Sequence, residues 1–353
     1  MHDRSAAVRI CVIVLLGAVG AAQAGEGASA PTSPPAAQTG TPPNLEAAAW
    51  LKKMAAASRQ LNYSGTIVYQ HRNQVETSRV VHFVNPAGGE FEKLETLDGP
   101  PREVIRSNDQ VVCYLPVAKT VLIEERNRNT RNFPALLPEA IGGISESYDI
   151  RKGEVDRTAG YDCQWISLVP RDNLRYGRRF CAELASGLPL RAQTIDDRNE
   201  RVESFAFTQL TIGGAFSRDQ VKSRWAEKSR AQNWRIDRSG FSAAAATPAD
   251  TGWVLTNSLP GFRKMMEAKR SIGGRNRVVS QIVFSDGLAA VSVFIEPMPA
   301  TQPAQSMSHQ GSVNIYTRPH GNHIVTVLGE APQGTIVRIG DSLELKPHTA
   351  ALQ

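Results

Sequence analysis

Hydrophobic and polar residues alternate in short runs over most of the chain from Tyr63 to Leu210. The runs are SGTIVYQ, TSRVVHFV, FEKLETL, REVIRS, QVVCYLP and KTVLIEE, followed by YDIRKGEVD, CQWISLV, YGRRFCAEL, LPLRAQTID and RVESFAFTQL. A period of two places successive side chains on opposite faces of a strand, and short turns join these runs. The pattern predicts one large antiparallel sheet, which at this length must curve strongly or close on itself.

Two segments depart from this alternation. Asn44 can cap a helix whose one face carries Ala47, Trp50, Leu51, Met54, Ser58 and Leu61. We expect that helix to pack on the core of the sheet. The apolar stretch 135–141 contains Pro138, which favours a helical or irregular segment over a strand.

The stretch LDGPPREVIRSNDQVVCYLP, residues 97–116, contains strong turn signals. Asp98-Gly99-Pro100-Pro101 predicts a turn, because glycine frees φ and proline fixes it and removes a donor. Two short strands are expected after it, around Ser107-Asn108-Asp109. We interpret the turn as a rigid element that sets the register of the adjoining strands.

A change of composition divides the chain. Residues 213–250 are polar. SRDQVKSRWAEKSRAQNWRID could form a short helix, and the closing RSGFSAAAATPAD predicts a linker, so that a first domain is expected at 44–212, a linker at 213–250 and a second domain at 251–346. The second unit contains four strand candidates, NRVVSQIVFSD, LAAVSVFIEP, SVNIYTRPH and NHIVTVLGE, and a closing helix. The sequence therefore predicts an α+β protein: a large curved antiparallel half-barrel with helices and a smaller mixed antiparallel C-terminal domain.

The N-terminus has the features of a secretory signal. Arg4 and Arg9 precede an apolar run, and Ala22-Gln23-Ala24 matches the small-x-small cleavage pattern. We expect a signal peptide at 1–24 and a disordered, proline-rich lead at 25–43. A lipoprotein signal would place its cysteine after the apolar run, whereas Cys11 lies at its start. The alternative is an uncleaved anchor, which the short run disfavours.

The charge of the exported chain is basic. The whole chain has a formal net charge of +6, and the segment 1–24 carries +1, which leaves 6 − 1 = +5. Export excludes nucleic acid as a partner and leaves anionic lipid, lipopolysaccharide phosphate or an acidic polypeptide. Solubility alone is the other explanation of this charge.

Three cysteines follow the signal segment. Cys113 is expected to be a buried thiol in an apolar strand, while Cys163 and Cys181 lie on two strands joined by a turn. A disulfide between Cys163 and Cys181 would cross that hairpin and set Trp165 opposite Arg179. A reduced, buried pair is an equally good interpretation.

Signatures of catalysis are scarce. His320 and His323 are the one close histidine pair of the exported chain, and a polar turn explains them better than a zinc site, which needs three or four ligands. The chain contains no Gly-x-Ser-x-Gly elbow and no phosphate loop. Asp196-Asp197 would face opposite sides of a strand. We predict no catalytic residue, no metal site and no cofactor, and therefore a binding function.

Two groups of residues are candidates for binding. The apolar positions could line a cavity for acyl chains or simply pack on the helix; they are Ile166, Leu168, Phe180, Leu184, Phe205 and Phe207. The basic positions could form an anion or partner surface or a solvated rim; they are Arg171, Arg175, Arg178 and Arg179, with Arg126, Arg128 and Arg131 in an earlier loop.

Several stretches resemble the RseB/MucB family of periplasmic regulators of the envelope-stress sigma factor sigma-E. They are SRQLNYSGTIVY, LDGPPREV, RDNLRYGRRF, GLPLRAQTIDDRNERVESFAFTQL, WVLTNSLPGF, FSDGLAAVSVFIE and GEAPQGTIVRI, in the same order as in the family. They span about residues 45–345. Each is a loose pattern, and the shared order makes them specific together.

The resemblance implies an N-terminal domain similar to lipoprotein carriers and a smaller C-terminal domain. It also implies binding to the periplasmic part of a membrane anti-sigma factor, RseA or MucA, which shields that factor from regulated proteolysis. Lipid or lipopolysaccharide acyl chains would be the release signal. A homodimer is a further possibility, and the family has no catalytic residues to assign to this sequence. The alternative function is a periplasmic lipoprotein or lipid carrier, but a carrier would not need residues 251–346.

Overall fold

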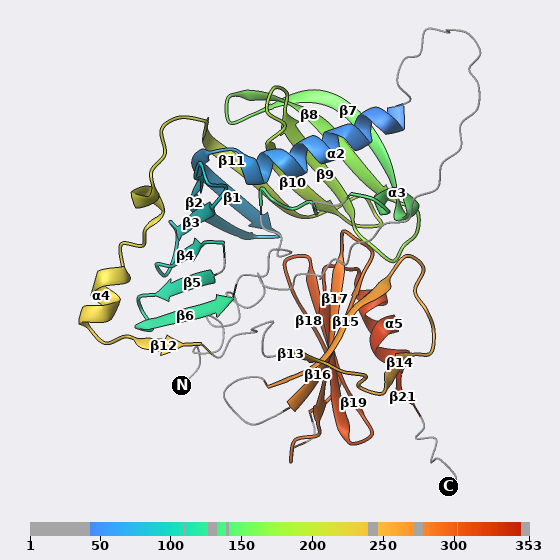
Figure 1. Ribbon diagram of the computed structural model, residues 1–353. Helices are drawn as coiled ribbons and strands as arrows, with labels where there is room; N and C mark the ends of the chain where they lie inside the picture. Colours follow the sequence, from blue (N-terminus) through green and yellow to red (C-terminus); the bar gives the residue numbers. More distant parts are fainter. Residues whose placement is uncertain are drawn as a thin grey trace, which may run out of the picture.

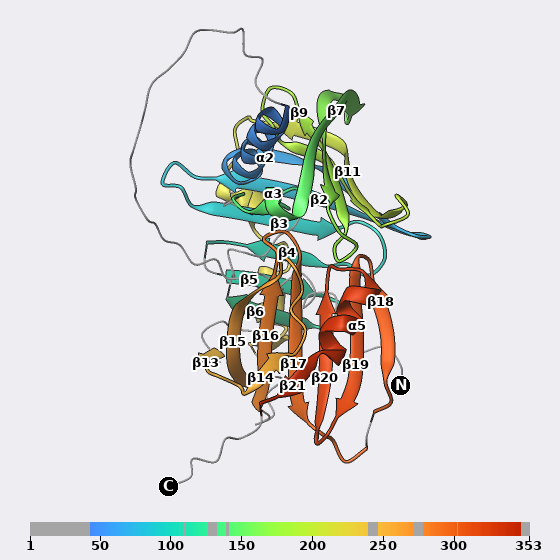
Figure 2. The same ribbon diagram turned by 90° about the vertical axis from the view of Figure 1, so that its right-hand side faces the viewer.

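The computed structural model describes residues 43–108, 110–125, 133–138, 141–238, 246–271, 278–301 and 303–346. They form two domains that meet end to end (Figures 1 and 2). One is built on a twelve-stranded sheet, and the other on a seven-stranded sheet with a separate two-stranded sheet. The predicted signal peptide, nearly all of the predicted lead, and Arg126, Arg128 and Arg131 lie outside the described residues. Within the described part, no helix is long and apolar enough to cross a membrane.

The N-terminal domain is a single twelve-stranded sheet in the order β12-β6-β5-β4-β3-β2-β1-β11-β10-β9-β8-β7. Its strands are β1 Tyr63–His71, β2 Gln74–Val84, β3 Glu90–Thr96, β4 Glu103–Arg106, β5 Gln110–Leu115, β6 Thr120–Glu125, β7 Tyr148–Thr158, β8 Tyr161–Pro170, β9 Gly177–Glu183, β10 Pro189–Ile195, β11 Arg201–Ile212 and β12 Arg235–Asp237. All neighbours are antiparallel except β12 and β6. The predicted curved antiparallel sheet is confirmed, and it does not close into a barrel.

Helix α2, Pro43–Gln60, lies across one face of this sheet (Figure 1). Its Ala47, Leu51 and Met54 are fully buried, in agreement with the helical face expected from the sequence. They belong to the same core as the inward residues of β8, β9 and β11. The apolar side chains on one face of the strands and on one face of α2 thus pack together in one layer.

The turn at 97–101 joins β3 to β4 as expected. Gly99 has φ 68°, a left-handed conformation that a side chain would disfavour. The carboxylate of Asp98 accepts the backbone N–H of Thr77 on β2 at 2.8 Å, and Arg102 pairs with Glu76 at 2.7 Å. The turn is therefore fastened to the neighbouring strand, which fixes the register of β2, β3 and β4.

Residues 213–238 differ from the predicted linker. They form η1 Arg218–Val221, α4 Ala226–Ala231 and β12, which pairs in parallel with β6 at the edge of the first sheet. Val221 and Trp234 are buried, and the guanidinium of Arg224 lies 3.1 Å from the buried carboxylate of Glu103. A few buried anchors hold this polar segment against the sheet, which its average composition did not reveal.

The C-terminal domain is a seven-stranded antiparallel sheet in the order β13-β15-β16-β17-β20-β19-β18. Its elements are β13 Ala246–Pro248, β14 Trp253–Leu255, β15 Arg263–Ser271, β16 Val278–Ser285, β17 Ala290–Pro297, β18 Ser306–Gln310, β19 Val313–His320, β20 His323–Gly329, α5 Gln333–Asp341 and β21 Leu343–Leu345. Helix α5 packs on β19 and β20, with Ile336 and Ile339 fully buried. This core is a distinct cluster from that of the first domain, although Leu174 of the first domain packs in it and Leu288 of the second domain packs in the other.

The structure joins Cys163 and Cys181 in a disulfide with a Cα–Cα distance of 5.3 Å. The register differs from the one expected, because Trp165 lies opposite Cys181 rather than Arg179. Arg179 lies two residues before Cys181 on β9, and its guanidinium packs over the Trp165 ring, 4.9 Å from the ring centre. The third cysteine, Cys113, is buried in β5 as expected, but it is disulfide-bonded and not the thiol that the sequence predicted.

Candidate functional site

The two domains meet along a line of polar contacts that we call the interdomain seam. Its residues are Tyr69, Tyr148, Asp172, Leu174, Arg175, Tyr176, Arg178 and Glu203 from the first domain, and Pro260, Asp286, Gly311, Ser312, Asn314, Glu330, Ala331 and Thr335 from the second.

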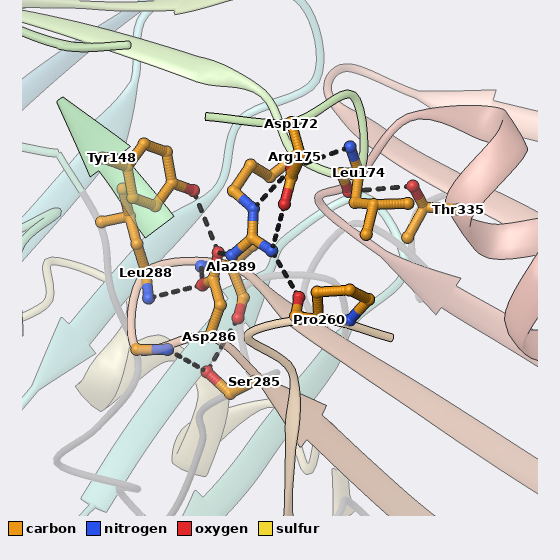
Figure 3. A network of polar contacts seen from close by, with 11 residues as sticks. Tyr148, Asp172, Leu174, Arg175, Pro260, Ser285, Asp286, Leu288, Ala289 and Thr335 are labelled. Carbon is orange, nitrogen blue, oxygen red and sulfur yellow. Dashed lines mark hydrogen bonds and ion pairs between the residues drawn. The ribbon is translucent and has the colours of Figure 1, made fainter. Parts of the chain in front are cut away.

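The loop between β8 and β9 aims an arginine at the second domain. Asp172 accepts the backbone N–H of Leu174 at 3.0 Å, which folds the loop on itself. The same carboxylate takes two bonds from the Arg175 guanidinium, at 2.9 and 3.0 Å. These bonds hold Arg175 extended toward the second domain (Figure 3).

Arg175 and Asp286 form a fully buried ion pair at the centre of the seam. The guanidinium donates to Asp286 at 2.6 Å and to the carbonyl oxygen of Pro260 at 2.7 Å, and both side chains have 0 % exposure. Asp286 also accepts the backbone N–H groups of Leu288 and Ala289, at 2.8 and 2.6 Å (Figure 3). Such a pair is tolerable in a dry interface because the remaining polar atoms are satisfied as well.

Tyr148 and Gly261 complete the surroundings of this pair. The Tyr148 hydroxyl donates to Asp286 at 3.1 Å, and burial, assisted by that carboxylate, holds the pKa of Tyr148 well above its usual range. Tyr148 therefore stays a donor at physiological pH. Gly261 has φ +76°, and a Cβ there would lie 2.9 Å from the Arg175 guanidinium and 2.6 Å from the Ser147 hydroxyl. The close approach of the domains requires a glycine at this point.

A second group of contacts surrounds Arg178 and Tyr176. Arg178 pairs with Glu330 of the second domain at 2.5 Å and also contacts Thr194. Asn314 donates to the Tyr176 hydroxyl at 2.9 Å and to the carbonyl oxygen of Ala331 at 2.8 Å. These contacts tie β19 and the loop before α5 to the start of β9.

The third group lies at the turn between β18 and β19. Glu203 accepts the backbone N–H of Ser312 at 3.0 Å and the Tyr69 hydroxyl at 3.1 Å. Gly311 has φ +60°, and a Cβ there would lie 2.4 Å from the Tyr69 oxygen. Burial, with Glu203 beside it, raises the pKa of Tyr69 above its usual value. The turn between β18 and β19 thus gives the seam a further anchor.

The predicted acyl-cavity residues mostly share one face of the first sheet. Ile166, Leu168, Phe180 and Phe207 are at most 2 % exposed and pack in one core with α2. Phe205 is partly buried, with its ring 5.6 Å from Phe133 and 4.7 Å from Tyr69. Leu184 is the exception, and its placement in a cavity is corrected: it follows the end of β9 and is 39 % exposed.

One cavity at this face is small. A cavity of about 30 Å³ lies beside Phe180, Ala192 and Phe205 and reaches Arg178 and Glu330 of the seam. A volume of this size holds about one water molecule and no acyl chain.

The four predicted arginines of the anion surface separate into two pairs. Arg171 and Arg179 are exposed, whereas Arg175 and Arg178 are buried in the seam with acidic partners. The prediction that Arg175 and Arg178 offer free positive charge on a surface is corrected, because carboxylates more than 100 residues away in the chain neutralise them. Arg175, Arg178 and Arg179 also line an open groove of about 630 Å³, together with Arg151 and Asp197.

Sequence reasoning missed the second half of the seam, including Asp286, Asn314 and Glu330. One signal was available, because four stretches that carry the family resemblance converge there. RDNLRYGRRF supplies Arg175, WVLTNSLPGF supplies Pro260 and Gly261, FSDGLAAVSVFIE supplies Asp286, and GEAPQGTIVRI supplies Glu330. The geometry assembles no metal centre among the described residues. The arrangement is suited to holding two domains in a fixed orientation.

Comparison with known proteins covers both domains. Residues 46–225 match the MucB/RseB N-terminal domain and residues 247–344 match the MucB/RseB C-terminal domain. The chain is 28 % identical over 316 residues to the sigma factor AlgU regulatory protein MucB of Pseudomonas aeruginosa, covering 87 % of this chain and 92 % of that protein. It is 24 % identical over 297 residues to the sigma-E factor regulatory protein RseB of Escherichia coli K12, covering 84 % and 90 %.

Solved structures agree with these matches. The crystal structure of MucB in complex with MucA(peri) is similar with a TM-score of 0.66 at 26 % identity, over 85 % of this chain and 99 % of that one. The complex structure of Pseudomonas aeruginosa MucA/MucB gives a TM-score of 0.67 at 26 % identity over the same shares. The similarity extends through both domains, and the chain belongs to the MucB/RseB family.

Proposed function

We propose that this protein is a periplasmic negative regulator of the sigma-E envelope-stress response. It binds the periplasmic part of a membrane anti-sigma factor of the RseA/MucA kind and shields that factor from regulated proteolysis. The observation that carries the proposal is the likeness, over 85 % of the chain, to MucB solved with MucA(peri). The signal-like segment 1–24 supports a periplasmic location.

The apolar face under α2 is the proposed site of the release signal. Lipid or lipopolysaccharide acyl chains would replace α2 or the segment 133–138 against Ile166, Phe180 and Phe207. An acyl ligand releases the partner only if it binds the partner-free state more tightly. Reciprocity then requires the partner to weaken acyl binding by the same factor, with a coupling of about 5–150-fold.

A titration of the mature protein with the periplasmic segment of the anti-sigma factor tests the proposal. We expect saturable binding that lipopolysaccharide weakens. Absence of binding would contradict the regulator. Binding that is indifferent to acyl chains would leave the regulator standing and reject the release signal.

The same apolar face also favours a second candidate, a lipoprotein or lipid carrier. Capture from an envelope extract separates the two functions. A regulator retains the anti-sigma factor, whereas recovery of lipoproteins without any anti-sigma factor would place the carrier first.

A further inference from the structure

Exposed edges of sheets differ in how they are protected against pairing with another chain. Natural sheets protect their edges with short strands, charged side chains, proline or bulges. Edge strand β12 has three residues, including Arg235 and Asp237. Edge strand β13 has three residues and ends in Pro248. Edge strand β7 is long, but its exposed stretch 151–157 is rich in charge and contains a bulge.

Strand β18 has none of these protections. Its sequence, Ser306-Met307-Ser308-His309-Gln310, contains no proline and no Asp, Glu, Lys or Arg, and every residue is exposed. Its register with β19 runs without a bulge from Ser306 opposite Thr317 to Gln310 opposite Val313. In the described part of the chain no strand pairs with its outer side, and Figure 2 shows β18 at the margin of the second sheet.

The hairpin geometry identifies the backbone groups that point outward. Gly311 and Ser312 form a two-residue loop, so the flanking pair of Gln310 and Val313 is a hydrogen-bonded pair. Hydrogen-bonded and non-hydrogen-bonded pairs alternate along an antiparallel ladder. The N–H and C=O groups of Met307 and His309 therefore turn away from β19 and face the open side.

Positive charge lies at one end of this edge. The ring of His309 is 6.1 Å from that of His71, and the exposed Arg72 follows at the β1–β2 turn. Burial, then Arg72 and His71, lower the pKa of His309. A strand added to β18 would extend toward a cation that favours an acidic side chain.

We propose that β18 is a docking edge for an extended, acidic segment of the protein partner. The segment adds a strand beyond β18, pairs with the backbone of Met307 and His309, and places a carboxylate against Arg72. This inference rests on the proposed function, which makes the partner the periplasmic part of the anti-sigma factor. Backbone pairing supplies affinity, and the contact with Arg72 supplies direction along the strand.

Met307→Pro is the direct test, because it removes an outward N–H and leaves the hairpin bonds of β18 intact. An edge strand tolerates proline when that N–H faces solvent. We expect Met307→Pro to weaken binding of the anti-sigma segment by about tenfold, the effect of losing about 1.4 kcal/mol. The matched control Met307→Ala keeps the backbone donor and should change affinity by less than about threefold. Equal melting temperatures of the two variants and the wild type exclude misfolding.

Two further measurements complete the test. Hydrogen exchange of the wild-type complex should show slower exchange at the amides of Met307 and His309. Arg72→Ala should weaken binding and reduce its salt dependence, because a charge contact is lost.

Each outcome has a definite meaning. Unchanged affinity of Met307→Pro, or unprotected amides in the wild-type complex, would overturn the docking edge and leave the proposed function intact. Failure of the wild type to bind would reject the proposed function together with this occupant. Self-association that Met307→Pro abolishes would assign the edge to a second copy of the chain and overturn the peptide partner.

Discussion

The face under α2 and the interdomain seam use opposite chemistry to hold the same molecule together. The first is an apolar layer in which Leu51, Met54 and Phe207 are sealed from water by one helix. The second is a line of charged and polar groups centred on Arg175 and Asp286. An apolar layer can exchange one apolar occupant for another with little cost, whereas a buried charge keeps its particular partner. The comparison suggests a face that can open and a seam that stays closed.

The largest effect is expected from breaking the central pair of the seam. Asp286→Ala leaves the Arg175 guanidinium with Asp172 as its carboxylate partner and removes the acceptor of the Tyr148 hydroxyl and of two backbone N–H groups. We expect a loss of about 3–5 kcal/mol of unfolding free energy. Chemical denaturation measures it. Arg263→Ala is the matched control, because its pair with Glu146 at 3.2 Å also joins the two domains but is mostly exposed. That control should cost no more than about 1 kcal/mol. Similar costs for both variants would show that burial of the pair is unimportant.

A comparable loss is expected at the apolar face. Phe207→Ala removes a ring that is 2 % exposed, and deletion of a buried phenylalanine costs about 3–5 kcal/mol. The matched control is Leu184→Ala, at an exposed position, where a change within about 0.5 kcal/mol is expected. Thermal melts and an acyl titration distinguish two cases. A variant that melts early and loses both ligands makes Phe207 plain core, while a stable variant with unchanged acyl affinity removes it from the site.

The smallest effect is expected at the glycine of the seam. Gly261 has a positive φ, and a Cβ there would clash with Arg175. We therefore expect Gly261→Ala to lower the unfolding free energy by about 1–3 kcal/mol. Gly287→Ala shares the positive φ, at +94°, but its Cβ would meet no atom within 4 Å. The difference between the two melting curves isolates the close approach of the domains. If Gly287→Ala destabilised the protein as much as Gly261→Ala, backbone strain alone would explain both.

The same contrast explains what the sequence could predict. The face under α2 follows from local periodicity, so α2, the strands and the shared side of Ile166, Phe180 and Phe207 were all accessible. The turn at 98–101 was accessible too, because glycine and proline mark it directly. The predicted place of Leu184 in the cavity was wrong because β9 ends at Glu183, one residue before the alternating pattern ends.

The seam could not be predicted in the same way. Arg175 and Arg178 look like surface arginines, because their partners Asp286 and Glu330 lie 111 and 152 residues away in the chain. Residues 213–238 read as linker because their few buried anchors, such as Trp234, are diluted by polar neighbours. The register of Trp165 depended on where the β8–β9 loop ends, which composition does not specify. In each case the missing information is a contact between distant segments.

Protection of the anti-sigma factor tests the central claim most directly. The measurement is the rate at which the first regulated protease cleaves the periplasmic part of that factor, with and without the mature protein. We predict that cleavage slows in proportion to the fraction of anti-sigma factor bound, and that it recovers when acyl ligand is added. Cleavage at an unchanged rate in the presence of saturating protein would contradict the account.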